Sequence, residues 1–240
     1  MSSRSTSELD SLPPAMPLYT VLIMLLAIAA GVFAAAVVLP SWLPGLSASL
    51  LGPEPKAYWY LSRSSAVVAY LLLWTSMATG LTISNRLARI WPGGPTAFDL
   101  HQYTSLLGMG FALFHALILM GDRYIAYTLS QVLIPFASDS YRPLWVGLGQ
   151  VGWYLMAIVS MTFYMRRKIG HRLWRLIHVM SYAMFALALL HGLLSGTDSG
   201  AIWARGMYWA SAASLLFLTV YRVLCVFTDR KATARRVARA

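Results

Sequence analysis

Six long apolar stretches, each carrying few charged residues, are the feature that most constrains how this chain can fold. A membrane-spanning helix needs about 20 predominantly apolar residues. The stretches that reach this length are 17–39, 60–83, 100–120, 144–165, 173–195 and 204–227. Only 11% of the residues are charged, against about 25% in soluble domains. The sequence therefore predicts an all-α fold: a polytopic membrane helical bundle of six transmembrane helices.

The predicted organisation is one membrane domain between two tails. Residues 1–16 are polar and rich in serine, which is typical of a disordered tail. Residues 17–227 form the transmembrane domain, and residues 228–240 form a short basic tail. The first apolar stretch exceeds the core of a typical signal peptide, which favours a retained span over a cleaved leader.

The 19 Lys and Arg residues are divided unevenly between the two ends of the predicted spans. Cytoplasmic loops of membrane proteins carry an excess of such residues. Five lie on one side, namely Lys56, Arg63, Arg123, Arg142 and Arg205, and the other fourteen lie on the side of the two termini. We therefore expect a multi-pass protein of the cell membrane with both termini in the cytoplasm. The charge of +11 then reflects topology and lipid contact, and no nucleic-acid partner is expected.

Two loops have readable features. Thr96 and Asp99 have the spacing of a capping box, which predicts the start of the third span. The loop after that span is long and half apolar. Its middle, 124–136, is too short to cross the bilayer, so we expect it to lie on the outer membrane surface or to cover the bundle as a lid.

Four of the five histidines lie inside predicted spans, where an unpaired imidazole is costly. His101 and His115 are fourteen residues apart on the third span. On an ideal helix this spacing leaves them within about 40° of one face and about 21 Å apart along the axis. Small residues lie between them on that face, namely Ser105, Gly108 and Ala112.

His178 and His191 lie on the fifth span, about 19.5 Å apart along an ideal helix but about 140° apart around it. A tightened turn or a bend would bring them onto one face; otherwise the two sites differ in azimuth. Both spans enter from the cytoplasm, so His101 is at the depth of His178, and His115 is at the depth of His191.

Two histidines at each of two depths, on two helices, are what bis-imidazole ligation of heme iron requires. The alternatives are four unrelated histidines bonded to neighbouring helices, or a di-metal site, which would need carboxylates that the spans lack. The single cysteine, Cys225, and the absence of a C-x-x-C-H motif exclude covalent c-type attachment. His171, in a basic loop, is interpreted as solvated or in contact with lipid.

Arg63 is the other costly residue, a few positions inside the outer end of the second span. One interpretation is that its long side chain reaches the lipid headgroups. The other is that it binds a propionate of the outer heme, or an anionic substrate nearby.

The histidine spacing, within six spans, resembles the ferric reductase-like transmembrane domain superfamily. That superfamily includes eukaryotic ferric reductases, NADPH oxidases and the bacterial heme subunit of the methionine sulfoxide reductase system. The stretch RRKIGHRLWRLIHVMSY is similar to the entry into one ligand helix of bacterial members, and DLHQYTSLLGMGFALFHALI is similar to the other. The resemblance covers about residues 58–225. It implies two b-type hemes, with His101 and His178 as inner metal ligands and His115 and His191 as outer ones.

The resemblance also implies a heme-dependent oxidoreductase that passes electrons between the two membrane faces. Flavin and nicotinamide domains follow the last span in the oxidases, whereas about thirteen residues follow it here. We therefore expect quinol or a separate flavoprotein as the donor, and a ferric chelate, oxygen or a periplasmic reductase as the acceptor. The alternatives are a non-catalytic heme subunit that anchors and relays electrons to a partner reductase, or a transporter or channel with the histidines as a proton path.

Overall fold

The structure, a computed structural model, describes residues 13–51 and 56–237, with side chains described as far as residue 228. Every regular element in these ranges is a helix. Six helical segments are long and apolar enough to cross a membrane, namely Leu18–Trp42, Lys56–Ser84, Gly94–Gly121, Pro143–Ile169, His171–Ser195 and Ile202–Thr228. The predicted fold class is confirmed, and the chain is a multi-pass membrane protein.

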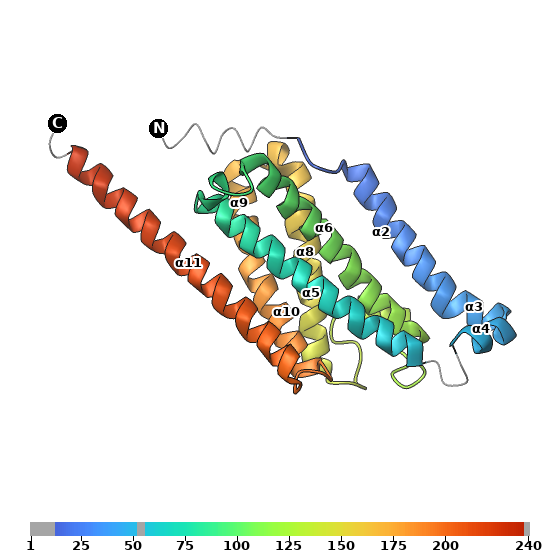
Figure 1. Cartoon of the computed structure of the whole chain (residues 1–240). Helices are drawn as coiled ribbons and strands as arrows, with labels where there is room; N and C mark the ends of the chain where they lie inside the picture. Colours follow the sequence, from blue (N-terminus) through green and yellow to red (C-terminus); the bar gives the residue numbers. More distant parts are fainter. Residues whose placement is uncertain (1–12, 52–55, 238–240) are drawn as a thin grey trace.

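The helices of this bundle alternate in direction along the chain (Figure 1). The α-helices are α2 (Leu18–Phe33), α3 (Leu39–Trp42), α4 (Pro44–Leu51), α5 (Lys56–Ser84), α6 (Gly94–Ile118), α7 (Leu129–Leu133), α8 (Pro143–Ile169), α9 (His171–Val179), α10 (Ser181–Ser195) and α11 (Ile202–Val237). A π-helical turn at Ala34–Val38 joins α2 to α3, just before Pro40, whose ring nitrogen cannot donate a helical hydrogen bond.

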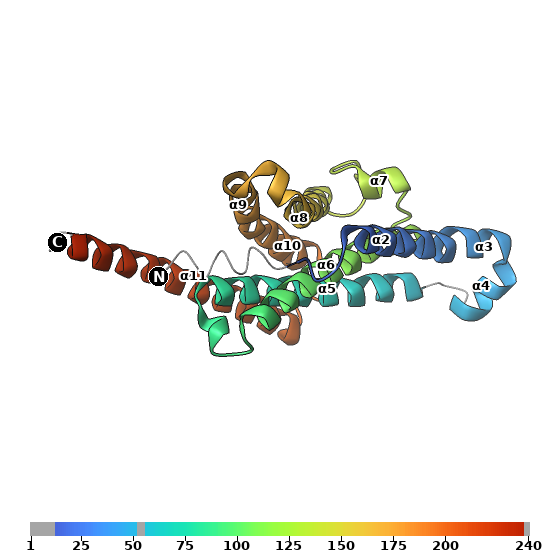
Figure 2. The same ribbon diagram turned by 90° about the horizontal axis from the view of Figure 1, so that it is seen from above.

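The bundle has two layers (Figure 2). In the first, α11, α5, α6 and α2 lie in a row, each packed on the next. In the second, α8 packs along α10, and this pair contacts the row through α6 and α5. The buried apolar core lies between the layers and includes Tyr70, Met109, Met156 and Phe185. The histidines predicted as ligands come from one helix of each layer, so they face each other across the core.

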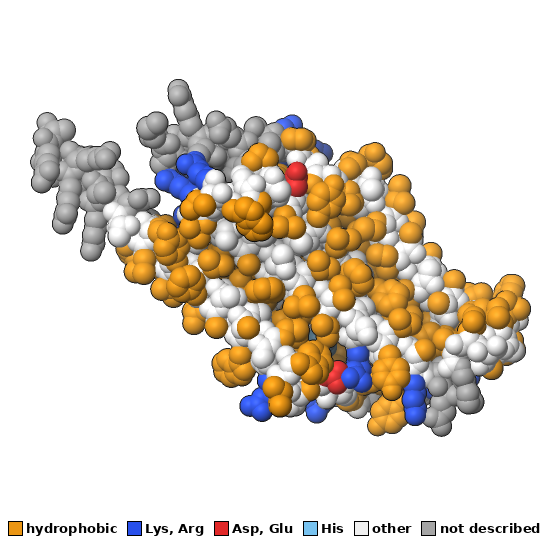
Figure 3. Space-filling model, viewed as in Figure 1, with side chains coloured by type: hydrophobic (Ala, Val, Ile, Leu, Met, Phe, Trp, Pro, Cys, Tyr) orange, Lys and Arg blue, Asp and Glu red, His pale blue; other side chains and the backbone are white. Residues whose placement is uncertain are grey.

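Apolar side chains cover the middle of the visible face, and basic side chains gather toward its two ends (Figure 3). Leu26, Leu216 and Phe217 are each at least 65% exposed, which is the environment that lipid supplies to a spanning helix. We call the end at which α2 begins and α11 finishes the terminal end, and the opposite end, which carries the 122–142 loop, the loop end.

The fifth span is interrupted between α9 and α10. The Met180 amide donates to the carbonyl of Ile177 three residues back, at 3.0 Å, and Met180 carries the helix onward. A tightened turn of this kind rotates each residue farther around the axis than an α-helix does. It lies between His178 and His191, where the sequence left a tightened turn or a bend open.

Two sequence predictions about loops have different outcomes. The predicted capping box is wrong: α6 begins at Gly94, its N-cap is Gly93, and no side chain caps it. Pro95 suits the first turn because its ring fixes φ and lacks an N–H, so Thr96 and Asp99 lie inside the helix. The 124–136 segment does not span. It forms the short α7, capped by Thr128 with Gln131.

The two predicted tails lie largely outside the described side chains. Of residues 1–16, the last four are described, and Ala15 and Met16 are held against the bundle. The Ala15 amide donates to Gln102 at 3.0 Å, and the Tyr164 hydroxyl donates to the Met16 carbonyl at 2.8 Å. The backbone of 228–237 continues α11.

Candidate functional site

The four histidines inside the spans form two pairs. The ring centroids of His101 and His178 are 6.0 Å apart, with 68° between the ring planes. Those of His115 and His191 are 6.1 Å apart, with 70° between the planes. We call the first the terminal-end pair and the second the loop-end pair. The structure therefore brings together the residues that the sequence places at equal depths.

Both rings of the loop-end pair are held through Nδ1. Nδ1 of His115 lies 2.8 Å from the Ser62 carbonyl oxygen, and Nδ1 of His191 lies 2.9 Å from the Trp145 carbonyl oxygen. A carbonyl only accepts hydrogen bonds, so Nδ1 carries the proton in each ring. Nε2 is then left with a lone pair, which is the form of imidazole that binds a metal.

The terminal-end pair is held less symmetrically. Nδ1 of His101 lies 2.8 Å from the Ser76 carbonyl oxygen, as in the loop-end pair. His178 lies against the indole of Trp174, with ring centroids 5.2 Å apart and 32° between the planes. Since Trp174 is one helical turn earlier on α9, the stack fixes the His178 ring from its own helix.

Two serines on α5 repeat the same contacts at the two depths. The Ser62 hydroxyl lies 2.8 Å from Nδ1 of His115 and donates to the carbonyl of the same residue at 3.1 Å. The Ser76 hydroxyl makes the matching contacts to His101 at 3.1 and 3.4 Å. Neither serine was predicted as a site residue. The sequence did contain a signal that could have found them. The two serines are fourteen residues apart, as are the two histidines on the next span.

Two glycines leave room for the histidine rings. A Cβ on Gly149 of α8 would lie 2.6 Å from Nδ1 of His191, and one on Gly80 of α5 would lie 3.1 Å from Cε1 of His101. Real Cβ atoms essentially never approach another atom to 2.6 Å. Any larger residue at 149 would therefore displace the His191 ring from the Trp145 carbonyl.

The ring spacing distinguishes two ways of pairing imidazoles. A direct N–H···N hydrogen bond of about 2.9 Å, with ring centres about 1.1 Å behind each nitrogen, gives centroids about 5.1 Å apart. One metal ion bound by both nitrogens at about 2.0 Å each gives about 6.2 Å. The observed 6.0 and 6.1 Å, with the rings in a T-shaped arrangement, are too long for the direct hydrogen bond and are compatible with the second arrangement.

Neither histidine pair is joined by a further His, Cys, Asp or Glu side chain among the described residues. Within the described ranges, no group of three or more His, Cys, Asp or Glu side chains could hold a metal ion. A bare ion would need more ligands than two imidazoles. A heme, which brings most of its iron's ligands itself, would need only two from the protein, and each histidine pair could supply them. The residues present therefore fit a heme and do not fit a bare ion or a di-metal site.

A cavity of about 250 Å³ contains both members of the loop-end pair in its lining. It runs between α5, α6, α8, α10 and α11, and small residues such as Gly108, Ala112 and Gly152 form part of its wall. Tyr127 and Val132, from the loop that carries α7, cover it. Of the two expectations for that loop, the structure favours the lid.

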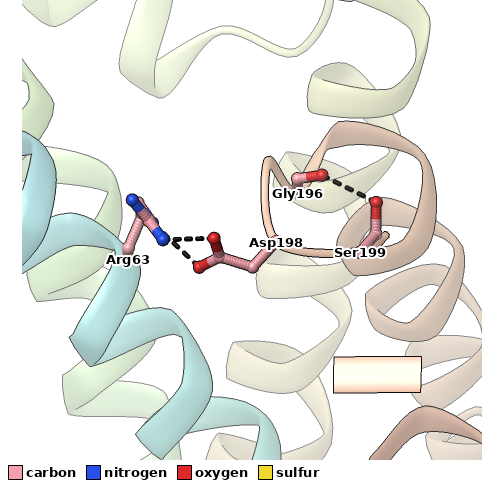
Figure 4. A network of polar contacts seen from close by, with 4 residues as sticks. All are labelled: Arg63, Gly196, Asp198 and Ser199. Atoms are coloured by element: carbon pink, nitrogen blue, oxygen red, sulfur yellow. Dashed lines mark hydrogen bonds and ion pairs between the residues drawn. The ribbon is translucent and has the colours of Figure 1, made fainter. Parts of the chain in front are cut away.

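Arg63 lies where this cavity reaches the surface, paired with Asp198 of the loop between α10 and α11 (Figure 4). Its Nε donates to one carboxylate oxygen at 2.9 Å, and its Nη2 donates to the other. The two side chains are 35% and 31% exposed. Sequence reasoning singled out Arg63 but missed Asp198, because nothing in the sequence connects positions 135 residues apart.

His171 lies apart from both pairs. It begins α9, and its ring contacts Trp174, with centroids 5.4 Å apart. Through Trp174 it is one ring removed from His178.

The chain belongs to the family described as a domain of unknown function (DUF8596), whose model matches residues 57–198. The matched range contains all four paired histidines, Arg63 and Asp198. No curated protein and no solved structure matches the chain.

Proposed function

We propose that this member of the family is a heme-dependent transmembrane oxidoreductase that passes electrons through two b-type hemes. The terminal-end pair holds one heme and the loop-end pair holds the other. The single observation that carries the proposal is the spacing of 6.0 and 6.1 Å between imidazole rings at two depths of one bundle.

Heme, when bound, supplies reversible one-electron chemistry. The chain's own residues set where that chemistry occurs. The carbonyls of Ser62, Ser76 and Trp145 accept from Nδ1 and so direct the unprotonated Nε2 inward. Hydrogen bonds of this kind fix the tautomer and orientation of a ligand histidine and raise its basicity.

The depth of the pairs suggests a route across the membrane. His101 and His115 are fourteen residues apart on the continuous helix α6, which places the two levels about 21 Å apart along its axis. Apolar residues such as Met109 and Phe185 fill the core between the layers. Apolar packing of this kind disfavours water between the two pairs.

The orientation and the partners belong to the same proposal. The excess of basic residues at the terminal end supports a cytoplasmic position for that end. Quinol or a separate flavoprotein then donates at the terminal-end pair, and a ferric chelate, oxygen or a periplasmic reductase accepts at the loop end. If the acceptor is a partner enzyme, the chain is a relay subunit with the same two heme sites.

The deciding experiment is an optical and stoichiometric analysis of the purified full chain in detergent. We expect a low-spin b-type spectrum on reduction and two hemes per polypeptide. A colourless protein after expression with sufficient heme would contradict the proposal and would favour a proton path through the histidines.

A further inference from the structure

The mouth of the loop-end cavity contains buried polar atoms that no described residue satisfies. The side chains of Tyr127 and Ser195 both line the cavity, and each residue is only 7% exposed. The Ser195 Oγ has no hydrogen-bond partner among the described residues, and the Tyr127 hydroxyl forms no well-directed hydrogen bond although the hydroxyls of Ser138 and Ser140 lie near it. Buried polar groups are normally paired, because leaving one unpaired is destabilising.

Other polar side chains of the same lining are satisfied. The Tyr141 hydroxyl donates to the Ser195 carbonyl at 2.8 Å, and the Gln150 amide donates to the carbonyls of Gln131 and Val132 at 2.7 Å. The lining is thus able to pair its hydroxyls internally, and the two that remain are the exception. Burial raises the pKa of the Tyr127 phenol, although the nearby hydroxyls of Ser138 and Ser140 act in the opposite direction, so this hydroxyl stays protonated and can donate.

Arg63 presents a third donor group at the same mouth, and it shows which chemistry suits it. Its Nε and Nη2 already bind the two oxygens of one carboxylate, that of Asp198 (Figure 4). A planar guanidinium fork matches a carboxylate in this two-point manner. Two hydroxyls and a guanidinium that already binds one carboxylate suit a second ligand of the same kind, which accepts hydrogen bonds and carries negative charge.

Two of these donors, Arg63 and Ser195, are close in sequence to residues that form or contact the loop-end pair. Arg63 is the neighbour of Ser62, which contacts His115. Ser195 is four residues after His191 on α10, which puts it on the same face one turn toward the loop end. Both donors therefore lie near the loop-end pair, in the lining of the same cavity.

We propose that Arg63, Tyr127 and Ser195 form a carboxylate-binding site at the mouth of the loop-end cavity, with Asp198 as the internal carboxylate that competes for Arg63. The inference rests on the proposed function in one respect: the nearest source of carboxylate is the pair of propionates on a heme held by His115 and His191. A soluble carboxylate that enters from the loop end offers the same group.

The test uses the full chain, produced without heme and reconstituted with either iron protoporphyrin IX or its dimethyl ester, which lacks free carboxylates. The variants are Ser195→Ala, Tyr127→Phe and the double variant. The matched controls are Tyr164→Phe and Ser41→Ala, which remove hydroxyls that donate to backbone carbonyls away from the cavity. The readouts are the heme content and the rate at which the loop-end heme is released.

With the natural heme we expect each variant to release the loop-end heme about ten- to 100-fold faster, since each loses a hydrogen bond to a charged group. The double variant should be faster still. The controls should match the wild type. With the dimethyl ester, wild type and variants should behave alike, which assigns the carboxylate to the heme. If the variants still differ, and citrate slows release from the wild type only, the carboxylate comes from solution.

Equal release by the double variant and the wild type with both hemes would overturn the carboxylate site while leaving the heme proposal standing. If instead the wild type binds no heme, the proposed function is wrong, and the carboxylate site can still be tested on the heme-free protein. Citrate titration of the heme-free protein, followed by isothermal titration calorimetry, then decides the inference. Binding that the double variant loses would support it, and no binding would overturn it.

Discussion

The two histidine pairs have almost the same ring spacing but differ in how the rings are supported. In the loop-end pair, His115 and His191 are each bonded to a backbone carbonyl of another helix. In the terminal-end pair, His101 has such a bond, whereas His178 stacks on Trp174 of its own helix, close to the interruption at Met180.

This difference in support indicates how rigidly each histidine pair is held. Bonds from two neighbouring helices fix the loop-end rings relative to the whole bundle. A stack within one short helix moves with that helix, so the position of His178 depends on how α9 joins α10. We therefore expect the loop-end site to be the more preorganised of the two.

The largest expected effect is the loss of one heme on removal of a ligand. His115→Ala or His191→Ala should remove the loop-end heme and leave the other, because the remaining imidazole supplies only one axial bond. His101→Ala or His178→Ala should remove the terminal-end heme instead. Heme content and the redox titration of the remaining heme measure this. His171→Ala is the control, and heme loss there would mean that the terminal-end ligand is wrongly assigned.

The second effect compares the glycines that border the two pairs. Gly149→Ala should displace His191 from the Trp145 carbonyl and weaken loop-end heme binding by about 10- to 100-fold, as loss of a ligand's hydrogen-bond partner typically does. Gly80→Ala should cost less, since its Cβ would be 3.1 Å from His101 and not 2.6 Å. Gly206→Ala meets no atom within 4 Å and serves as the control. A larger loss from Gly80→Ala would reverse the ranking of the two levels.

The third effect tests the ring stack. Trp174→Ala should speed release of the terminal-end heme by a few-fold, because an aromatic pair contributes about 0.5–1.5 kcal/mol. Trp174→Phe keeps a ring beside His178 and should retain most of the binding. The loop-end heme should be unaffected in both, as followed by its separate midpoint potential. Equal effects on the two hemes would mean that Trp174 supports the bundle and not His178.

The smallest effect concerns the charges at the loop end. Arg63→Ala leaves the Asp198 carboxylate unpaired, which disfavours an added electron, so the loop-end midpoint potential should fall. Asp198→Asn leaves the cation unpaired, and the potential should rise. Partly exposed pairs are worth about 0.2–1 kcal/mol, which corresponds to about 10–40 mV for one electron. The double variant should return close to the wild type, and the terminal-end potential should stay constant throughout.

Much of the architecture could be predicted from local sequence. Membrane spans are selected by length and apolarity, so the six spans were found to within a few residues. The largest differences are at the starts of α5 and α6, at Lys56 and Gly94, and at the end of α8, at Ile169, because polar residues can continue a helix beyond its apolar part. The pairing of histidines by depth was also predictable, since axial rise depends only on residue number.

The sequence by itself determined the six spans, the two depths and the residues that face each other there, because periodicity and hydropathy act along one chain. Only the tertiary structure decided what supports the rings. The Trp145 carbonyl, the Arg63–Asp198 ion pair and the 2.6 Å approach of Gly149 to His191 join residues far apart in sequence. Contacts of this kind depend on how the helices pack, and packing is a property of the assembled bundle and not of any single span.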